Sequence, residues 1–397
     1  MIEGWKNVPL SELATFYSGG TPNKGQPSYW GGAIPWVTVK DMKVMRLNGV
    51  GESLTEEGAD TVRVVPAGTV LVLVRGMGLF KDLPVVLCDR PVAFNQDIKA
   101  LVAKKNIDSE YLAFALIARK SDILRHVDSA GHGTGRLDTD LLKSTPLPIP
   151  PLSEQRKISE ILRTWDKAIE KLNALRAANL RRRIWMRTHL FTGRTRRPGY
   201  SGEWREVALG EILTEHRLHG TGAEEVFSVS VHKGLVNQIE HLGRSFAAAE
   251  TGHYNRVLPG DIVYTKSPTG EFPLGIIKQS KVSQEVIVSP LYGVFSPTTH
   301  ALGVILDALF ESPVAVRNYL HPLVQKGAKN TIAITNRRFL EGKLHLPMDP
   351  MEQAAIAEVI DTSQAELSCI EAEIDLLTRQ KRGLMEKLLT GEWRVKS

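Results

Sequence analysis

Residues 146–162 read PLPIPPLSEQRKISEIL, and residues 345–360 read HLPMDPMEQAAIAEVI. In both stretches prolines precede a Glu-Gln pair, and apolar residues then recur at helical spacing. Pro151 and Pro350 are 199 positions apart. A helix-start signal that occurs twice in one chain raises the question of an internal repeat.

The same offset relates other parts of the two halves. Trp5 and Trp204 also differ by 199 positions, and after a one-residue gap the offset becomes 198, which relates Ile158 to Ile356. One register, interrupted once, therefore holds from the start of each half to its end. The chain is a tandem repeat.

The repeat predicts four segments. A first body of mixed character occupies 1–150 and is followed by a long helix within 151–200, and a second body at 201–346 is followed by a second helix within 347–397. The bodies read as α+β. Expected strands lie at 62–74, 85–87, 98–102, 226–231, 261–264 and 286–288, with helices at 109–124 and 301–310. The turn at Pro66-Ala67-Gly68 matches the turn at Leu258-Pro259-Gly260, and little else can be matched between the bodies.

The two long helices predict a coiled coil. No proline or glycine occurs from 152 to 192, and Ser153 is the expected N-cap of a helix at 154–191. Apolar residues follow a four–three spacing in both copies. They are Ile158, Leu162, Trp165, Ile169, Leu172, Met186 and Leu190, and Ile356, Ile360, Leu367, Ile370, Ile374, Leu377, Leu384 and Leu388. At 1.5 Å per residue the rod would measure about 57 Å, the length of roughly 17 base pairs.

Charge predicts how the helices pair. Residues 352–375 contain seven acids and no lysine or arginine, whereas 173–191 contain five arginines and no acid. Antiparallel pairing places these segments side by side, with the two bodies at opposite ends and related by a pseudo-two-fold axis. Contacts with phosphate are one explanation of Arg181–Arg183, Arg194, Arg196 and Arg197. Ion pairs between the helices and a solvated hinge explain them at least as well, and we favour that explanation.

Composition bounds the class of protein. The chain of 397 residues is 42% hydrophobic and 24% charged, and its net charge of +6 permits a polyanionic partner without requiring one. Cys88 and Cys369 form neither a disulfide framework nor a zinc site. The N-terminus lacks the features of a signal peptide, and no apolar run could span a membrane. We therefore expect a cytoplasmic protein without a membrane partner.

The search for catalytic motifs predicts no catalytic residue and no metal site. Residues 20–26 have the outer glycines of a phosphate loop without its lysine and hydroxyl, and 131–136 lack dinucleotide-binding spacing. Asp82, Asp97 and Lys99 loosely resemble a metal-dependent nuclease site, a pattern that is common by chance. A stand-alone nuclease or methyltransferase therefore stays open as an alternative, as does a structural coiled-coil adaptor.

Both bodies contain glycine-rich loops that carry basic, amide and hydroxyl side chains. Arginine, lysine, asparagine and glutamine read base edges, while hydroxyls and backbone amides hold phosphates. A single loop of this kind is common on protein surfaces. The prediction of DNA binding therefore rests on the occurrence of such loops in both bodies. The predicted DNA contacts are Ser18, Gly20, Thr21, Lys24, Lys40, Arg75, Lys81, Asn95, Gln96, Thr134 and Arg136 in the first body, and Lys233, Lys266, Thr269, Lys329, Asn330, Thr331, Asn336 and Arg337 in the second.

With LPIPPLSEQRKISEIL and LPMDPMEQAAIAEVI each between a body and a long helix, the chain resembles the specificity subunits of type I restriction–modification systems. SGGTPNKGQPSYWGGAIPWVTVKDM, residues 18–42, also resembles the start of a target-recognition domain of that family. The resemblance covers essentially the whole chain. It implies two α/β target-recognition domains separated by an antiparallel coiled coil.

The resemblance also implies a function. Each recognition domain would read one half of a bipartite, asymmetric target in double-stranded DNA, and the helices would set the gap between the halves. Two modification subunits that use S-adenosylmethionine would dock on the frame and methylate adenine, and restriction subunits would use ATP and Mg²⁺. This chain would bind no cofactor itself. The implied frame and docking residues are Pro151, Leu152, Glu154, Gln155, Ile158 and Trp165, and Pro350, Met351, Glu352, Gln353 and Ile356.

The second frame copy departs from the first. PMEQAA lacks the leucine of PLSEQ, the copy is one residue shorter, and it has no counterpart of Arg156 and Lys157. One modification subunit would therefore meet a different surface from the other.

Overall fold

The computed structural model describes residues 4–395 except 48, 131–132, 192, 194, 197, 243–250 and 327–331. The chain divides into two compact units. Unit 1 comprises Met1–Asn173 with Glu373–Ser397, and unit 2 comprises Ala174–Ala372. Each unit thus combines one body with half of each long helix.

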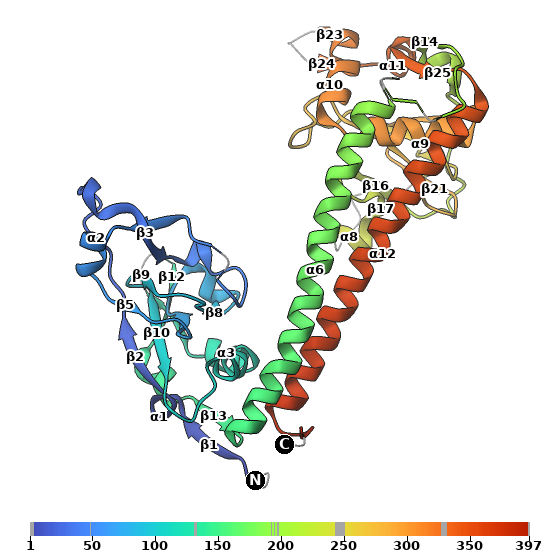
Figure 1. Cartoon of the computed structure of the whole chain (residues 1–397). Helices are drawn as coiled ribbons and strands as arrows, with labels where there is room; N and C mark the ends of the chain where they lie inside the picture. Colours follow the sequence, from blue (N-terminus) through green and yellow to red (C-terminus); the bar gives the residue numbers. More distant parts are fainter. Residues whose placement is uncertain are drawn as a thin grey trace. The chain divides into compact units, whose positions relative to one another are not determined.

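A four-stranded antiparallel sheet in the order β2-β10-β6-β8 forms the centre of unit 1 (Figure 1). Its strands are Ala14–Ser18, Ile98–Ala103, Val70–Leu73 and Val85–Leu87. All four residues of β6 are buried, because the strand lies inside the sheet and helix α3, Ser109–Ala118, packs against it. Valine and leucine suit such a doubly covered strand.

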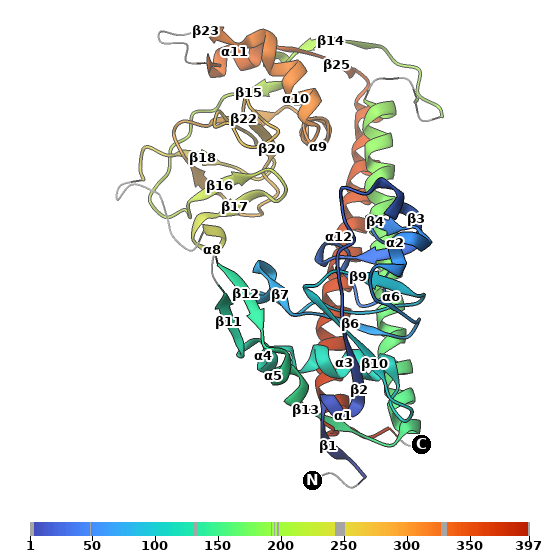
Figure 2. The ribbon, with the colours of Figure 1, turned by 90° about the vertical axis from the view of Figure 1, so that its left-hand side faces the viewer.

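Two further sheets and one strand pair complete the body of unit 1. A second sheet has the order β4-β3-β9-β5, with strands Glu52–Leu54, Trp30–Val37, Val92–Phe94 and Val64–Val65. A third has the order β11-β12-β7, with strands Val127–Ala130, Thr134–Leu137 and Arg75–Gly76 (Figure 2). Strand β1, Lys6–Pro9, pairs with β13, Pro146–Ile149, directly before the long helix. The short helices are α1, Leu10–Leu13; α2, Glu56–Asp60; α4, Lys120–Leu124; and α5, Thr139–Ser144.

Unit 2 repeats this topology. Its central antiparallel sheet has the order β15-β22-β19-β20, with strands Leu213–Thr214, Gly293–Pro297, Ile262–Thr265 and Ile276–Gln279, and α9, His300–Leu309, packs against it. Strand β14, Trp204–Ala208, pairs with β25, Lys343–Pro347, as β1 pairs with β13. The remaining helices of the body are α7, Leu209–Ile212; α8, Gln238–Leu242; α10, Pro313–Leu320; and α11, Asn336–Glu341.

The turn matched from sequence has the same geometry in both units. Gly68 has φ of 81° and Gly260 has φ of 89°, and each precedes a buried inner strand by two residues. Glycine adopts such positive φ values without the steric cost that a side chain would bring. Little else could be matched between the bodies from sequence, and the structure shows that their central sheets nevertheless share one strand order.

The units also differ. Unit 2 has a hairpin of β16, Phe227–Ser230, and β17, Gly234–Asn237, and a pair of β18, Asn255–Val257, with β21, Val286–Val288. A short pair, β23 Gln325–Lys326 and β24 Ile332–Ala333, completes it. Unit 1 has the strands β3 and β4 in its own second sheet. The two units therefore share their central sheet and differ in the strands around it.

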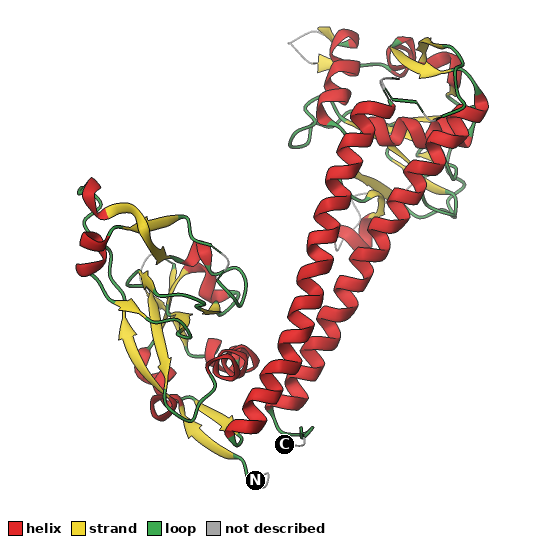
Figure 3. Cartoon of the chain, viewed as in Figure 1, coloured by secondary structure: helices red, strands yellow, loops and turns green. Residues whose placement is uncertain are grey.

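The long helices are α6, Leu152–Leu190, and α12, Pro350–Leu389 (Figure 3). None of the predicted seam residues is exposed, and Ile158 and Leu162 are fully buried. The predicted antiparallel pairing is confirmed within each unit. In unit 1 Lys381 Nζ lies 2.5 Å from Asp166 Oδ1, and in unit 2 Arg182 forms an ion pair with Glu366.

Two local predictions need correction. Helix α6 begins at Leu152, so Ser153 lies inside its first turn, and the amides of Glu154 and Gln155 donate to Pro151 O. The helix expected at 109–124 is interrupted at Arg119, which leaves α3 and α4 as separate helices. In the part of the chain that the structure describes, none of the helices combines the length and apolarity needed to cross a bilayer.

Candidate nucleic-acid interface

The structure brings together the loop that follows β2 and the loop between β9 and β10. Thr21 Oγ1 lies 2.7 Å from Gln96 Oε1, and Gly20 N donates to Phe94 O. Ser18 accepts a 2.6 Å hydrogen bond from Lys99. Ser18, Gly20, Thr21 and Gln96, which were predicted separately from sequence, thus form one polar surface at one end of the central sheet.

Asn95 and Lys24 border this surface in different ways. Asn95 is 9% exposed, and its Nδ2 donates to Asp97, so it braces the loop from within. Lys24 is exposed, and its Nζ lies 5.5 Å and 5.3 Å from the ring centroids of Trp30 and Trp36. Cation–π attraction to the two indole rings holds the ammonium group of Lys24 at the surface. Glu52 is 3.5 Å away but is half exposed, which weakens that ion pair.

Arg75 and Arg136 lie directly opposite each other on the paired strands β7 and β12. Both are exposed, and neither has an ion pair within the described residues. On its other side Arg136 lies opposite Asp128 of β11, so Arg75 is the arginine without an opposed acid. Like charges at directly opposed positions destabilise a sheet. An anion placed between them would remove that repulsion. Thr134 is on the same strand as Arg136, so three predicted contacts share one ribbon.

Sequence reasoning missed two residues beside this ribbon. Met77 and Phe80 are 74% and 51% exposed and lie between Arg75 and Lys81. Exposed large apolar side chains beside arginine or lysine are suited to contact the thymine methyl group or to insert at a step between base pairs. The usable signal was the sequence RGMGLFK itself, where apolar residues sit in a glycine-rich loop. Lys40 and Lys81 are exposed, as a phosphate contact requires.

In unit 2, two predicted residues converge on one carboxylate. Asn336 Nδ2 donates to Glu215 Oε1 at 2.6 Å, and Glu215 also acts electrostatically on Lys266. Partial burial lowers the pKa of Lys266, and the charge of Glu215 opposes that effect. Lys266 and Asn336 therefore both interact with Glu215, and a phosphate or base of DNA would have to compete with this carboxylate for them.

The remaining predicted contacts of unit 2 are dispersed. Arg337 is exposed and forms an ion pair with Glu341 at 3.3 Å on the same helix. Thr269 lies in an exposed turn after β19, and Lys233 lies in the turn of the β16–β17 hairpin. Lys329, Asn330 and Thr331 lie outside the described residues.

The nuclease-like pattern is not assembled as a site. Asp82 binds Lys120 Nζ at 2.8 Å, whereas Asp97 binds Asn95 and Lys99 binds Ser18. Each of the three thus has a different partner. Within the described ranges no group of three or more histidine, cysteine or acidic side chains is placed to hold a metal ion.

The two Glu-Gln pairs have an internal role. Glu154 is 3% exposed, accepts two hydrogen bonds from Arg394 at 2.8 Å and 3.0 Å, and lies 3.3 Å from Trp5 Nε1. Glu352 is 2% exposed and accepts from Arg196 at 2.8 Å and from Trp204 at 3.2 Å. The same Trp–Glu–Arg clamp therefore joins each body to the start of its helix.

The glutamines complete these junctions. Gln155 is 1% exposed, donates to Pro150 O and accepts from the backbone N–H of Asp108, where α3 begins. Gln353 donates to Pro347 O at 2.8 Å. These geometries support a frame role and place the Glu-Gln pairs, with Ile158 and Ile356, out of reach of a partner.

Other predicted docking residues are accessible. Pro151 and Pro350 are exposed, Leu152 and Trp165 are half-buried, and Met351 is 69% exposed. Among the predicted frame residues, an incoming partner could touch only these five. Docking by them stays a prediction.

Comparisons with known proteins match part of this chain to a known family. Residues 2–178 match the family described as type I restriction modification DNA specificity domain. The specificity subunit of the type I restriction enzyme EcoR124I/EcoR124II of Escherichia coli is 35% identical over 165 residues, which is 41% of this chain and 40% of that protein. The MjaIX specificity subunit of Methanocaldococcus jannaschii is 28% identical over 172 residues, which is 42% of this chain and 39% of that protein. The match thus spans about two-fifths of each relative.

Solved structures extend the likeness of fold to the whole chain. The S subunit of a type I restriction–modification system from M. genitalium has a TM-score of 0.59 at 17% identity and covers 97% of this chain and 96% of that one. A chain from a type I restriction–modification assembly has a TM-score of 0.54 at 15% identity, covering 98% and 99%. The expected resemblance to type I specificity subunits is confirmed, as is the predicted class of fold.

Proposed function

We propose that this relative of type I specificity subunits is the DNA-recognition subunit of a type I restriction–modification complex and performs no catalytic step itself. One observation carries the proposal: two units share one sheet order and one Trp–Glu–Arg clamp, while their loops differ. A conserved frame with divergent loops is suited to reading two unlike half-sites, which a symmetric dimer cannot do.

The two units would bind DNA through different surfaces. In unit 1 the surface around Thr21 and Gln96 and the ribbon with Arg75 and Arg136 supply amide donors and unpaired guanidinium groups. Amides and arginines read base edges in the major groove, and hydroxyls hold the adjacent phosphates. In unit 2 the corresponding sheet end carries Lys266 with its neighbours.

The long helices would act as a spacer and as a docking surface. Because α6 and α12 each continue from one unit into the other, a change of their length would alter the gap between half-sites. Two modification subunits would dock at the exposed parts of the junctions, around Pro151 and around Met351. Their S-adenosylmethionine, and the ATP and Mg²⁺ of restriction subunits, would be bound by those partners.

A mobility-shift assay on the chain assembled with its modification subunits tests the proposal. We expect tight binding to one bipartite asymmetric sequence and much weaker binding when either half is scrambled. Binding of the assembled complex to all sequences with equal affinity would refute it. Methylation or cleavage of DNA by the purified chain alone, with S-adenosylmethionine or Mg²⁺, would favour the enzyme alternative instead.

A further inference from the structure

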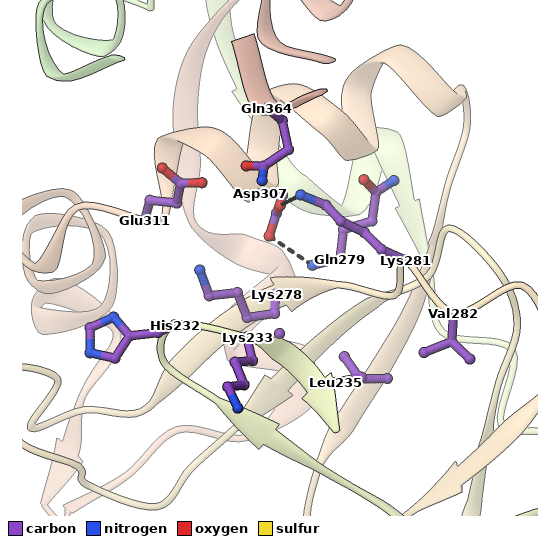
Figure 4. A pocket seen from close by; sticks show the side chains of 11 residues that line it. His232, Lys233, Leu235, Lys278, Gln279, Lys281, Val282, Asp307, Glu311 and Gln364 are labelled. Atoms are coloured by element: carbon purple, nitrogen blue, oxygen red, sulfur yellow. Dashed lines mark hydrogen bonds and ion pairs between the residues drawn. The ribbon is translucent and has the colours of Figure 1, made fainter. Parts of the chain in front are cut away.

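A cavity of about 290 Å³ lies in unit 2 between the β16–β17 hairpin, β20, α9 and α12 (Figure 4). Three lysines and two carboxylates line it, together with His232, Gln279 and Gln364. The lysines are Lys233, Lys278 and Lys281, and the acids are Asp307 and Glu311. This volume is at the lower end of the range of small-ligand sites.

Lys278 is the unusual member of the wall. The residue is 8% exposed, and its side chain forms no hydrogen bond or ion pair with the residues that the structure describes. Figure 4 shows its side chain extending into the cavity between the hairpin and Glu311. A largely buried lysine whose ammonium group reaches a cavity without a counterion is costly to keep charged, and an anion in the cavity would balance that charge.

The nearby carboxylates are already neutralised by other bases. Asp307 Oδ2 lies 2.8 Å from Lys281 Nζ, and its Oδ1 accepts a 3.0 Å hydrogen bond from Gln279 N. Glu311 forms ion pairs with Arg183 and with Arg187. Neither acid is therefore available to balance Lys278, and the charge of the cavity stays positive.

The other unit shows that the fold does not require a lysine here. Lys278 pairs with Val263, three residues after Gly260, and in unit 1 Val86 pairs with Leu71, three residues after Gly68. Val86 is fully buried in the core. The position is thus satisfied by valine in one unit and carries an unbalanced cation in the other.

We propose that this cavity is an anion-binding site that takes a phosphate group, with Lys278 as its largely buried lysine and Lys233 as its exposed one. A lysine ammonium offers three donors and a full charge, which suits a tetrahedral oxyanion. The phosphate belongs either to the DNA backbone or to a free phosphorylated small molecule. The free-phosphate case does not depend on the proposed DNA-recognition function.

The test compares the full chain with two variants, Lys278→Met and the control Lys343→Met, whose lysine is exposed on β25. Thermal unfolding is followed in inorganic phosphate and in chloride at equal ionic strength. Mass spectrometry then measures acetylation of Lys278 in the wild type, alone, with inorganic phosphate and with duplex DNA. Methionine retains the length of the lysine stem and removes the charge.

We expect the chain without ligand to tolerate Lys278→Met with no loss of melting temperature, because a charge without a counterion is removed. Phosphate should raise the melting temperature of the wild type and of Lys343→Met but not of Lys278→Met, with a loss of affinity of about tenfold or more. Protection of Lys278 by inorganic phosphate identifies a free ligand. If duplex DNA protects Lys278 and inorganic phosphate does not, while Lys343 is still acetylated, the bound phosphate belongs to the DNA backbone.

If neither phosphate nor DNA protects Lys278, the proposal is overturned. Should Lys278→Met fail to fold, Lys233→Met provides the second measurement, because this exposed turn residue is outside the core. It should weaken phosphate binding while leaving the melting temperature of the free chain unchanged. An unaltered phosphate response in Lys233→Met would equally count against the site.

Discussion

Replacement of both arginines of the β7–β12 ribbon should weaken DNA binding, and replacement of Arg75 alone should stabilise the free chain. Arg75 and Arg136 are directly opposed across the two strands, whereas Asp128 lies opposite Arg136 on β11 and no described acid forms an ion pair with Arg75. Relief of the repulsion in Arg75→Gln should add about 0.2–1 kcal/mol to the free energy of unfolding. A stability gain that accompanies a loss of binding separates a contact residue from a structural one.

The expected loss of binding follows from counterion release. Each phosphate contact contributes about 0.9 to the slope of log Kobs against log salt concentration, so loss of two contacts lowers the slope by about 1.8. Between 50 and 200 mM salt the wild type should then lose about twelvefold more affinity than the double variant. The assay is fluorescence anisotropy of a labelled duplex that contains the target, with the modification subunits present.

A control that removes one positive charge is available on the same unit. Lys143 forms an exposed ion pair with Asp140 at 3.0 Å, so Lys143→Gln removes a charge outside the β7–β12 ribbon. This control should leave the salt slope unchanged. If the double arginine variant also keeps the wild-type slope, the ribbon does not contact phosphate and the reasoning is wrong.

The helix junctions and cysteines give three more predictions. Glu154→Gln should cost about 1–3 kcal/mol in urea unfolding, because it removes the buried charge and places an N–H donor where one carboxylate oxygen accepts from Arg394, and a loss under 0.5 kcal/mol would contradict the clamp. Arg182→Gln should cost about 0.5 kcal/mol or less, because its ion pair with Glu366 is half exposed, and a larger loss in the same assay would count against this account. Burial raises the pKa of the Cys88 thiol to about 12, so iodoacetamide at pH 8 should label exposed Cys369 alone in the folded chain, and labelling of both would be inconsistent with this burial.

The frame could be predicted from sequence because its signals are periodic and doubled. The apolar seam, the acidic stretch 352–375 and the basic stretch 173–191 predicted antiparallel helices, and Lys381–Asp166 and Arg182–Glu366 confirm that pairing. Strands such as β8 and β21 were found at the predicted residues because short β-branched runs bounded by turns are typical of buried strands.

The sites could not be predicted to the same degree, since they depend on pairs of residues that are distant in sequence. The opposition of Arg75 and Arg136 follows from strand register, which no local pattern reveals. Lys278 follows Ile276 and Ile277 in an apolar strand, where a lysine is normally assigned to an exposed face. The burial of Glu154 depends on Arg394, 240 positions away, so the Glu-Gln pair looked accessible from sequence alone.

The most direct test is methylome sequencing of cells that express the modification subunits with this chain or with a variant in which residues 204–344 are replaced by another recognition domain. The account predicts one bipartite asymmetric motif, methylated on adenine in each half, and a swap that changes one half and leaves the other half and the gap unchanged. Methylation without a bipartite motif, or a swap that alters both halves, would contradict the account.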